Sequence, residues 1–193
     1  MKKLVLSLSI LSILSFSCSS DDDNGLDGTE VENQEEEINF ARVILMADNG
    51  DEVILTAEVD GDEVVETGGE LLPNTVYTGA LELTNEVEND TLDEVIEEAD
   101  DHQFFYLIGG GLDATSSYID MDSQGNAFGS EFTIETGEAS EGTLNVQLRH
   151  LPNKTAEGVQ NGDPTNAGGE TELNAVFPIT IAAASAEEVT AAE

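Results

Sequence analysis

Short runs in which apolar and polar residues alternate, separated by turn signals, constrain the fold of this chain more than any other feature. In the run 143–150, Leu, Val, Leu and His share one face, and Thr, Asn, Gln and Arg share the other. Alternation with a period of two is typical of a strand with one buried face. Comparable apolar runs occupy 38–47, 53–59, 76–84, 102–108, 117–121, 131–135 and 173–181. They predict an all-β, immunoglobulin-like sandwich of about eight strands.

Three of these runs also carry information about their place in a sheet. The sequence Asp-Asn-Gly-Asp at 48–51 tolerates positive φ, so it predicts a hairpin between 38–47 and 53–59. Both faces of 102–108 are largely apolar, which is typical of a central strand under a covering layer. Pro178 has no N–H to donate, so it predicts an edge position or a bulge in 173–181.

One segment has helical rather than strand periodicity. Thr91 and Glu94 are spaced as a capping box, and the residues that follow place apolar side chains on one stripe. We therefore predict one short helix in the sandwich. Its C-terminal end is acidic, which the helix dipole disfavours. Such an end either faces solvent or indicates that a cation lies there.

The first 17 residues predict a signal peptide. Lys2 and Lys3 precede an apolar run at 4–16 that is too short to span a bilayer. The only cysteine, Cys18, follows at once. This arrangement resembles a bacterial lipoprotein signal, in which the cysteine becomes the lipidated first residue. The alternative is an ordinary cleaved signal with an incidental cysteine.

The rest of the chain divides into a tether, a domain and a tail. Residues 18–37 comprise the acylated cysteine and a disordered acidic tether, because they hold too few apolar side chains to fold. The sandwich occupies 38–181, and 182–193 form a disordered tail. An acidic run directly after an acylated cysteine resembles the export signal of surface-displayed lipoproteins. It therefore favours the cell surface over the periplasmic side of the outer membrane.

The charge of the chain excludes one class of partner. The sequence has 42 acidic and five basic side chains, a formal net charge of −37. Such a field repels nucleic acid and anionic lipid headgroups, so we expect no nucleic-acid partner. A single cysteine allows no disulfide within the chain. We expect a monomer that contacts the membrane through its lipid.

Several runs resemble a group of uncharacterised bacterial outer-membrane lipoproteins: 36–39, 101–106, 148–154 and 168–172. Members are sometimes described as type 1 periplasmic binding fold proteins. That fold alternates strands and helices over two lobes, which this strand-rich chain does not match. The resemblance implies a lipid-anchored protein that captures a nutrient, such as a metal ion, for an outer-membrane importer.

The two histidines suggest a metal site. His102 follows an acidic stretch at the start of a predicted strand, and His150 ends another. Imidazole and carboxylate together suit zinc or a similar ion. If the two strands are neighbours, both rings could meet with carboxylates of the stretch, namely Glu97, Glu98 and Asp101. The alternative is that each histidine packs at a strand end and bonds the backbone.

A second candidate site has the spacing of a calcium loop. Acidic and amide residues between 120 and 131 resemble an EF-hand in composition: Asp120, Asp122, Gln124, Asn126 and Glu131. The flanking residues read as strands rather than helices. The alternative is therefore a hairpin turn whose polar side chains bond their own backbone.

Two cations mark a third candidate. Arg149 and Lys154 bracket His150 at the start of a long polar loop, 151–170. They either receive an anionic group of a ligand or pair with carboxylates of neighbouring strands. Loops of this length without regular structure are often functional, so this is a predicted ligand loop.

No enzyme is predicted. The serines form no Gly-x-Ser-x-Gly elbow, and no phosphate-binding glycine loop precedes a helix. We expect a lipid-anchored acidic binding module at the outer membrane, with zinc as a candidate ligand. The alternative is a structural or adhesive surface module whose turns are stabilised by calcium.

Overall fold

The computed structural model describes residues 38–60, 63–85 and 91–183. The predicted signal peptide, Cys18, the tether and most of the predicted tail lie outside the described residues. The elements follow in the order β1 (Phe40–Ala47), β2 (Glu52–Asp60), β3 (Glu63–Thr67), β4 (Gly69–Leu71), β5 (Val76–Thr84), α1 (Thr91–Glu97), β6 (His102–Gly109), β7 (Ala114–Tyr118), β8 (Glu131–Thr136), β9 (Ser140–His150), the 3₁₀ helices η1 (Val159–Asn161) and η2 (Pro164–Asn166), and β10 (Glu170–Ile181).

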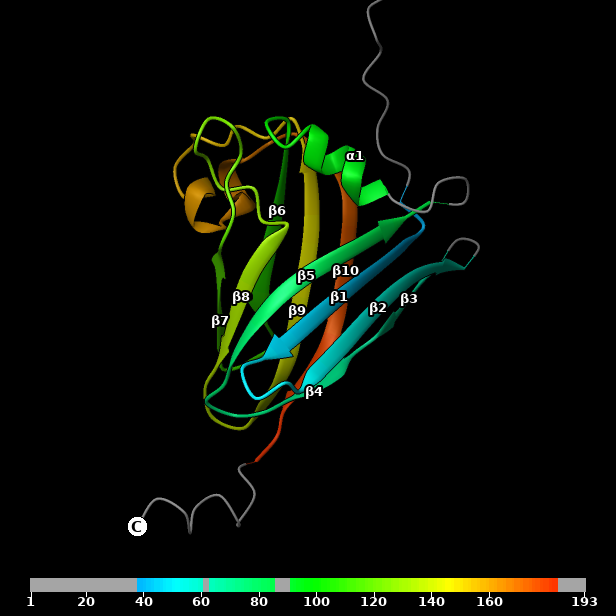
Figure 1. Ribbon diagram of the computed structural model, residues 1–193, viewed down its shortest axis with the longest axis vertical. Coiled ribbons are helices and arrows are strands. Elements are labelled where there is room, and N and C mark those ends of the chain that lie inside the picture. Colours follow the sequence, from blue (N-terminus) through cyan, green and yellow to red (C-terminus); the bar gives the residue numbers. More distant parts are fainter. Residues whose placement is uncertain (1–37, 61–62, 86–90, 184–193) are drawn as a thin grey trace, which may run out of the picture. The chain divides into compact units, whose positions relative to one another are not determined.

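The strands form two sheets that pack face to face. One sheet has the order β3-β2-β1-β5-β8-β7, and the other has the order β4-β10-β9-β6. Figure 1 shows α1 lying across one end of both sheets. The all-β sandwich with one short helix is confirmed. The structure has ten strands in its described part rather than about eight, because the short strands β3 and β4 were not predicted.

The strand pattern arises from alternation, as the sequence predicts. In β1, Ala41, Val43 and Leu45 point into the core and are buried. The predicted hairpin joins β1 to β2, and Gly50 in its turn has φ +89°. Side chains of both sheets form one continuous core. Burial of that core is the main source of stability for such a sandwich.

A glycine makes room for the contact between the two sheets. Gly79 of β5 lies opposite Phe132 of β8, and a Cβ atom at Gly79 would lie 2.2 Å from the phenyl ring. That ring in turn stacks on Tyr106 of β6, with the ring centroids 3.7 Å apart. Phe132 therefore links the six-stranded sheet to the four-stranded one, and only glycine fits beneath it.

The strand β6 lies at the edge of its sheet, so the prediction of a central strand is wrong. The predicted covering layer is nevertheless present. Phe105 is fully buried under Val159 and Ala167, which belong to the segment between β9 and β10. The strand is apolar on both faces because one face meets the core and the other meets this segment.

Side chains of β7 cover the outer edge of β6. The Ser116 hydroxyl donates to the Tyr106 carbonyl at 2.9 Å, and the Tyr118 hydroxyl donates to the Phe104 carbonyl at 2.7 Å. The Phe104 N–H donates to the carbonyl of Phe128. These bonds satisfy backbone groups that an edge strand would otherwise leave open. The two sheets are thus joined along this side by side chains.

Candidate metal centre

The two histidines lie directly opposite each other. His102 begins β6 and His150 ends β9, and the antiparallel register of these strands pairs the two residues. Their rings stack with centroids 4.8 Å apart and an interplanar angle of 14°. Both residues face the core at the end of the sandwich that α1 covers (Figure 1). The sequence-based expectation that the two rings could meet agrees with this pairing.

A carboxylate reaches the histidine pair through a β-bulge. The strand β10 pairs with β9, and its register shifts between Thr171 and Leu173. Regular alternation from the buried face of β10 would turn Glu172 outward, since Leu173 already packs against the core. The extra residue at the bulge lets Glu172 point inward as well. Bulges commonly redirect a side chain in this way.

The three side chains form a compact, buried group. His102 Nε2 lies 3.2 Å from Glu172 Oε2, and His150 Nδ1 lies 3.4 Å from Glu172 Oε1. The side chains of His102, His150 and Glu172 are 1%, 5% and 2% exposed. One ligand atom from each lies within 4.8 Å of the other two. This is the only such group of His, Cys, Asp or Glu among the described residues.

The backbone of the helix end fixes the proton on His102. Nδ1 lies 3.1 Å from the carbonyl oxygen of Glu98, just after α1. A carbonyl oxygen only accepts, so Nδ1 carries the hydrogen and donates it. In a neutral ring Nε2 then presents its lone pair to the carboxylate. A histidine that ligates a metal is commonly oriented by a bond of this kind on its other nitrogen.

The pKa of His102 reflects two opposing effects. Burial of the ring is the largest single effect and lowers the pKa. The Glu172 carboxylate, the Glu98 carbonyl and the charge of the Glu98 side chain together outweigh burial, so the pKa lies above its usual value of 6.5. The metal-free protein therefore keeps the second proton of His102 to a higher pH than an ordinary imidazole does.

The donor atoms, and the two distances from the histidines to the carboxylate, suit a zinc-type ion. Zinc bonds nitrogen and oxygen at about 2.0–2.1 Å, so adjacent ligands of a tetrahedral site lie about 3.3 Å apart. The contacts of 3.2 and 3.4 Å, which reach the two different oxygens of Glu172, match that separation, while the ligand atoms taken one per residue lie within 4.8 Å of one another. Three protein ligands would leave one position for a further ligand. Calcium, in contrast, prefers oxygen ligands throughout.

The acidic ligands predicted from the sequence are not the ones the structure brings to the histidines. The side chains of Glu97, Glu98 and Asp101 are exposed. They lie at and just beyond the end of α1, whose core side is occupied by buried Val95. Only Glu98 contributes to the group, and it does so through its main-chain carbonyl.

The predicted calcium ligands are not gathered into a site, and the alternative hairpin turn agrees with the structure. Asp122 accepts hydrogen bonds from the backbone N–H groups of Gln124 and Asn126. Asp120 accepts from the residues that lead into β8, including the N–H of Glu131. The oxygens of these two carboxylates that calcium would need accept hydrogen bonds, mainly from the backbone of the turn.

Arg149 and Lys154 have different environments. Lys154 pairs with Asp122 at 3.0 Å, as the carboxylate-pairing alternative predicted. Arg149 lies on β9 and donates to Gln147, with no carboxylate partner within the described part of the chain. The segment 151–169 is packed over β6 rather than forming an open ligand loop. Its residues Gln160–Gly162 do line a pocket, described below.

Comparisons with protein-family models, with curated proteins and with solved structures found no match. The fold and the site therefore rest on the geometry of this chain. No helix in residues 38–60, 63–85 or 91–183 combines the length and apolarity needed to cross a membrane.

Glu172 is the site residue that the sequence-based predictions missed. Alternation along 173–181 assigns it to the outer face, and only the bulge reverses that assignment. Pro178 indicates an irregularity in the same strand, but at the wrong end. The pairing of β10 with β9 places Glu170 opposite His150 and so brings Glu172 near the histidines. A single sequence does not reveal which strands pair.

Proposed function

We propose that this protein is a lipid-anchored, non-catalytic binding module at the outer membrane that holds one divalent metal ion of the zinc type. His102, His150 and Glu172 would be its ligands. The observation that carries the proposal is the approach of His102 Nε2 to Glu172 Oε2 at 3.2 Å inside the core.

Two lone pairs do not remain so close in a buried site without a positive charge between them. His102 Nδ1 already holds the hydrogen that bonds Glu98. The charge must therefore come from a second proton on the ring or from a metal ion. A metal ion satisfies both histidines and the carboxylate at once, and nitrogen with oxygen donors select a zinc-like ion over calcium.

Burial supports binding rather than catalysis. The ligand side chains are at most 5% exposed, so a substrate in solvent would not reach them. The acidic surface raises the local concentration of cations near the protein. Capture of the ion for an outer-membrane importer is what the lipoprotein resemblance implies, and we retain it as part of the proposal.

Metal content tests the proposal directly. We expect purified full-length protein to bind one zinc ion per chain in equilibrium dialysis followed by elemental analysis. His102→Gln and Glu172→Gln should each weaken binding by more than the roughly 10–100-fold that loss of a supporting contact produces.

Glu98→Ala is the matched control. It removes an exposed carboxylate whose charge acts on His102 from a distance but keeps the carbonyl that orients the ring, so zinc affinity should fall far less than in His102→Gln. Absence of zinc from protein loaded at neutral pH would reject the proposal. A melting temperature that rises with calcium and ignores the His102 change would instead support the structural or adhesive alternative.

A further inference from the structure

We propose that the pocket between β7 and η1 binds a neutral, hydroxyl-rich small molecule of the mono- or disaccharide class. This inference is independent of the metal centre, because none of the three proposed metal ligands lines the pocket. The pocket lies instead on the side of the sandwich where side chains of β7 bond the backbone of β6.

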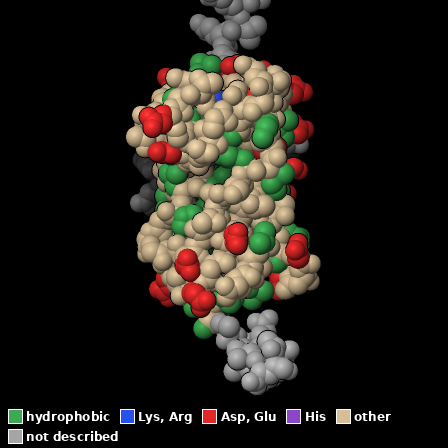
Figure 2. Space-filling view, turned by 90° about the vertical axis from the view of Figure 1, so that its left-hand side faces the viewer, with side chains coloured by type: hydrophobic (Ala, Val, Ile, Leu, Met, Phe, Trp, Pro, Cys, Tyr) green, Lys and Arg blue, Asp and Glu red, His purple; other side chains and the backbone are tan. Residues whose placement is uncertain are grey.

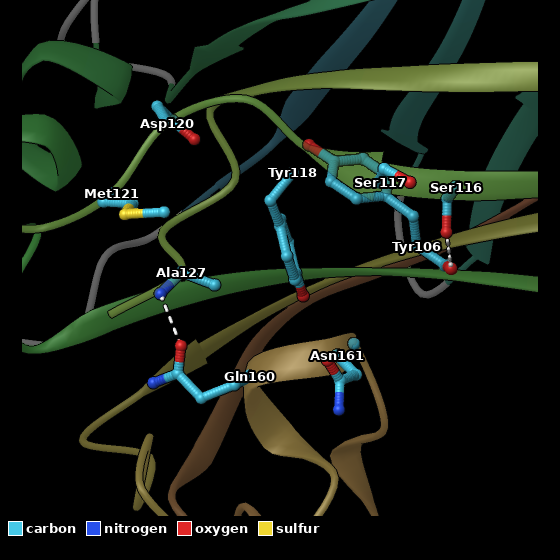
Figure 3. Close-up of a pocket in the computed structure, with 10 residues that line it drawn as sticks. Tyr106, Ser116, Ser117, Tyr118, Asp120, Met121, Ala127, Gln160 and Asn161 are labelled. Atoms are coloured by element: carbon cyan, nitrogen blue, oxygen red, sulfur yellow. Dashed lines mark hydrogen bonds between the residues drawn. The ribbon is translucent and has the colours of Figure 1, made fainter. Parts of the chain in front are cut away.

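The pocket has the size of a ligand site. Its volume is about 420 Å³, within the range of about 300–1,000 Å³ typical of small-molecule sites. Its walls come from the edge strands β6 and β7, the loop that follows β7, and η1 with the adjoining Gly162. Figure 3 shows Tyr118 between β7 and the η1 residues Gln160 and Asn161.

The lining carries no group that would hold an ion. It has no Lys, Arg or His, and a chain this acidic repels anions. Its one carboxylate, Asp120, already accepts from two backbone N–H groups and the Ser130 hydroxyl. Burial raises the pKa of Tyr118 to about 12, so this phenol stays neutral. These walls therefore disfavour an anionic ligand.

Part of the wall is held rigid by internal hydrogen bonds. The Tyr118 hydroxyl donates to Phe104 and accepts from Gln103. The side-chain amide oxygen of Gln160 accepts from the Ala127 N–H, as drawn in Figure 3. Binding to such a preformed wall does not require ordering of these side chains, which favours affinity.

Other lining groups are available to a ligand. In the described chain, the Ser117 hydroxyl and the Asn161 side-chain amide make no intramolecular hydrogen bond, and both residues are exposed. Together they offer donors and acceptors of both kinds. Met121 adds a large apolar surface, since it is 68% exposed.

This combination matches the chemistry of a sugar. A pyranose ring has one face of C–H groups, which suits the Met121 and Tyr118 surfaces, and an edge of hydroxyls, which suits Ser117 and Asn161. Figure 2 views the side of the molecule on which β7 and η1 lie, and most acidic side chains there lie toward its edges. A neutral ligand is therefore not exposed to a concentrated charge at the middle of this face.

Titration of the full-length protein with free sugars, followed by amide chemical shifts, tests the proposal. The probes are glucose, galactose, mannose, maltose, cellobiose and lactose, with glucuronate and glucosamine as charged counterparts of glucose. We expect at least one neutral sugar to shift the Ser117, Asn161 and Gly162 amides saturably. We expect glucuronate to bind more weakly than glucose, because the acidic chain repels it.

Variants make the test specific. Ser117→Ala and Asn161→Ala should each weaken binding severalfold, whereas Thr115→Ala, an exposed site on the same strand outside the lining, should not. If no neutral sugar shifts the lining amides, if glucuronate binds best, or if Thr115→Ala weakens binding as much as Ser117→Ala, the proposal is overturned. Loss of zinc binding in Glu172→Gln with sugar binding retained would separate this site from the metal centre.

Free sugars and the ends of a surface glycan share this chemistry. Comparing a disaccharide with a soluble polysaccharide of the same repeat distinguishes them. Tighter binding of the polysaccharide, per sugar unit, would indicate a glycan chain as the natural source, and equal binding would indicate the free sugar. Either result supports a neutral saccharide as the ligand.

Discussion

The ammonium group of Lys154 lies 3.0 Å from a carboxylate oxygen of Asp122, and the two side chains are 5% and 0% exposed. The same ammonium also donates to the carbonyl oxygen of Ala99, just beyond α1. Lys154 therefore connects three segments: the loop after β9, the turn before β8 and the end of the helix. The acidic C-terminal end of α1 predicts that either solvent or a cation lies beside it, and the Lys154 ammonium lies there.

Lys154→Met should be strongly destabilising, because it leaves the Asp122 carboxylate buried without its cation. Breaking one side of a buried pair typically costs about 3–5 kcal/mol. Urea unfolding of the two proteins at neutral pH measures the difference. The double variant Lys154→Met with Asp122→Asn should lose less than the sum of the single changes. A single variant as stable as the unaltered protein would contradict this role for Lys154.

Acid should weaken the contribution of Asp122. Burial raises the pKa of this carboxyl. Hydrogen bonds from Asn126 and the Lys154 ammonium lower the pKa by more than burial raises it, so the net pKa lies below its usual 3.8. A lowered pKa gives stability that is present above pH 3.8 and is lost as the pH falls through the folded-state value. The stability gap between the unaltered protein and Asp122→Asn should therefore shrink below pH 3.8. Denaturant unfolding at several pH values would reveal a constant gap if this is incorrect.

The metal-free protein should lose stability as the pH rises through the pKa of His102. That pKa is raised above 6.5, so the contribution is fully present below pH 6.5 and disappears as the folded ring loses its proton. His102→Gln should remove this pH dependence. Thermal melts in the presence of a chelator, at pH 6 and pH 9, measure it for both proteins. An identical pH response in the variant would argue against His102 as the group responsible.

Removing the hydroxyl that covers the edge of β6 should be measurable. Ser116→Ala deletes the donor to the Tyr106 carbonyl, and the net value of such a bond is about 1 kcal/mol. Ser117→Ala, one residue along, deletes an exposed hydroxyl and should stay within about 0.5 kcal/mol of the unaltered protein. Equal effects at the two serines in chemical denaturation would show that the edge bond contributes nothing.

Gly79→Ala should disturb the contact between the sheets. The new methyl group would lie 2.2 Å from the Phe132 ring, which must shift and so disturb its stacking on Tyr106. Overpacking of this kind typically costs about 1–3 kcal/mol. Gly125→Ala lies in an open turn where a Cβ meets nothing within 4 Å, and its φ of +84° strains an alanine there, so it should cost stability without crowding the core. Near-UV circular dichroism should change only for Gly79→Ala.

Most strands could be predicted because alternation is a local property. The runs at 76–84 and 131–135 became β5 and β8 with nearly the predicted bounds. β3 and β4 were missed because they are short, and Val64 and Val65 of β3 are largely exposed, so no buried face marks them. The predicted strand 117–121 begins and ends later than β7, since Asp120 turns the chain away to bond Gly129.

The candidate metal centre could be predicted only in part. Both histidines stood out because the chain has just two, but their register across β6 and β9 is set by long-range pairing. The predicted carboxylate ligands were those nearest to His102 in the sequence, and these lie at the end of the helix. The true neighbour comes from a strand more than twenty residues beyond His150.

The bulge in β10 also determines what a change of length would do. If Thr171 were deleted, Glu172 would take the register position opposite Arg149 with Leu173 still opposite Leu148, and the strand would return to strict alternation with β9. The acid would then face solvent while both histidines kept their identity and place. The number of residues in β10 therefore decides whether this end of the sandwich can hold a cation. Two chains with the same two histidines and the same glutamate could differ completely in their affinity for a metal ion.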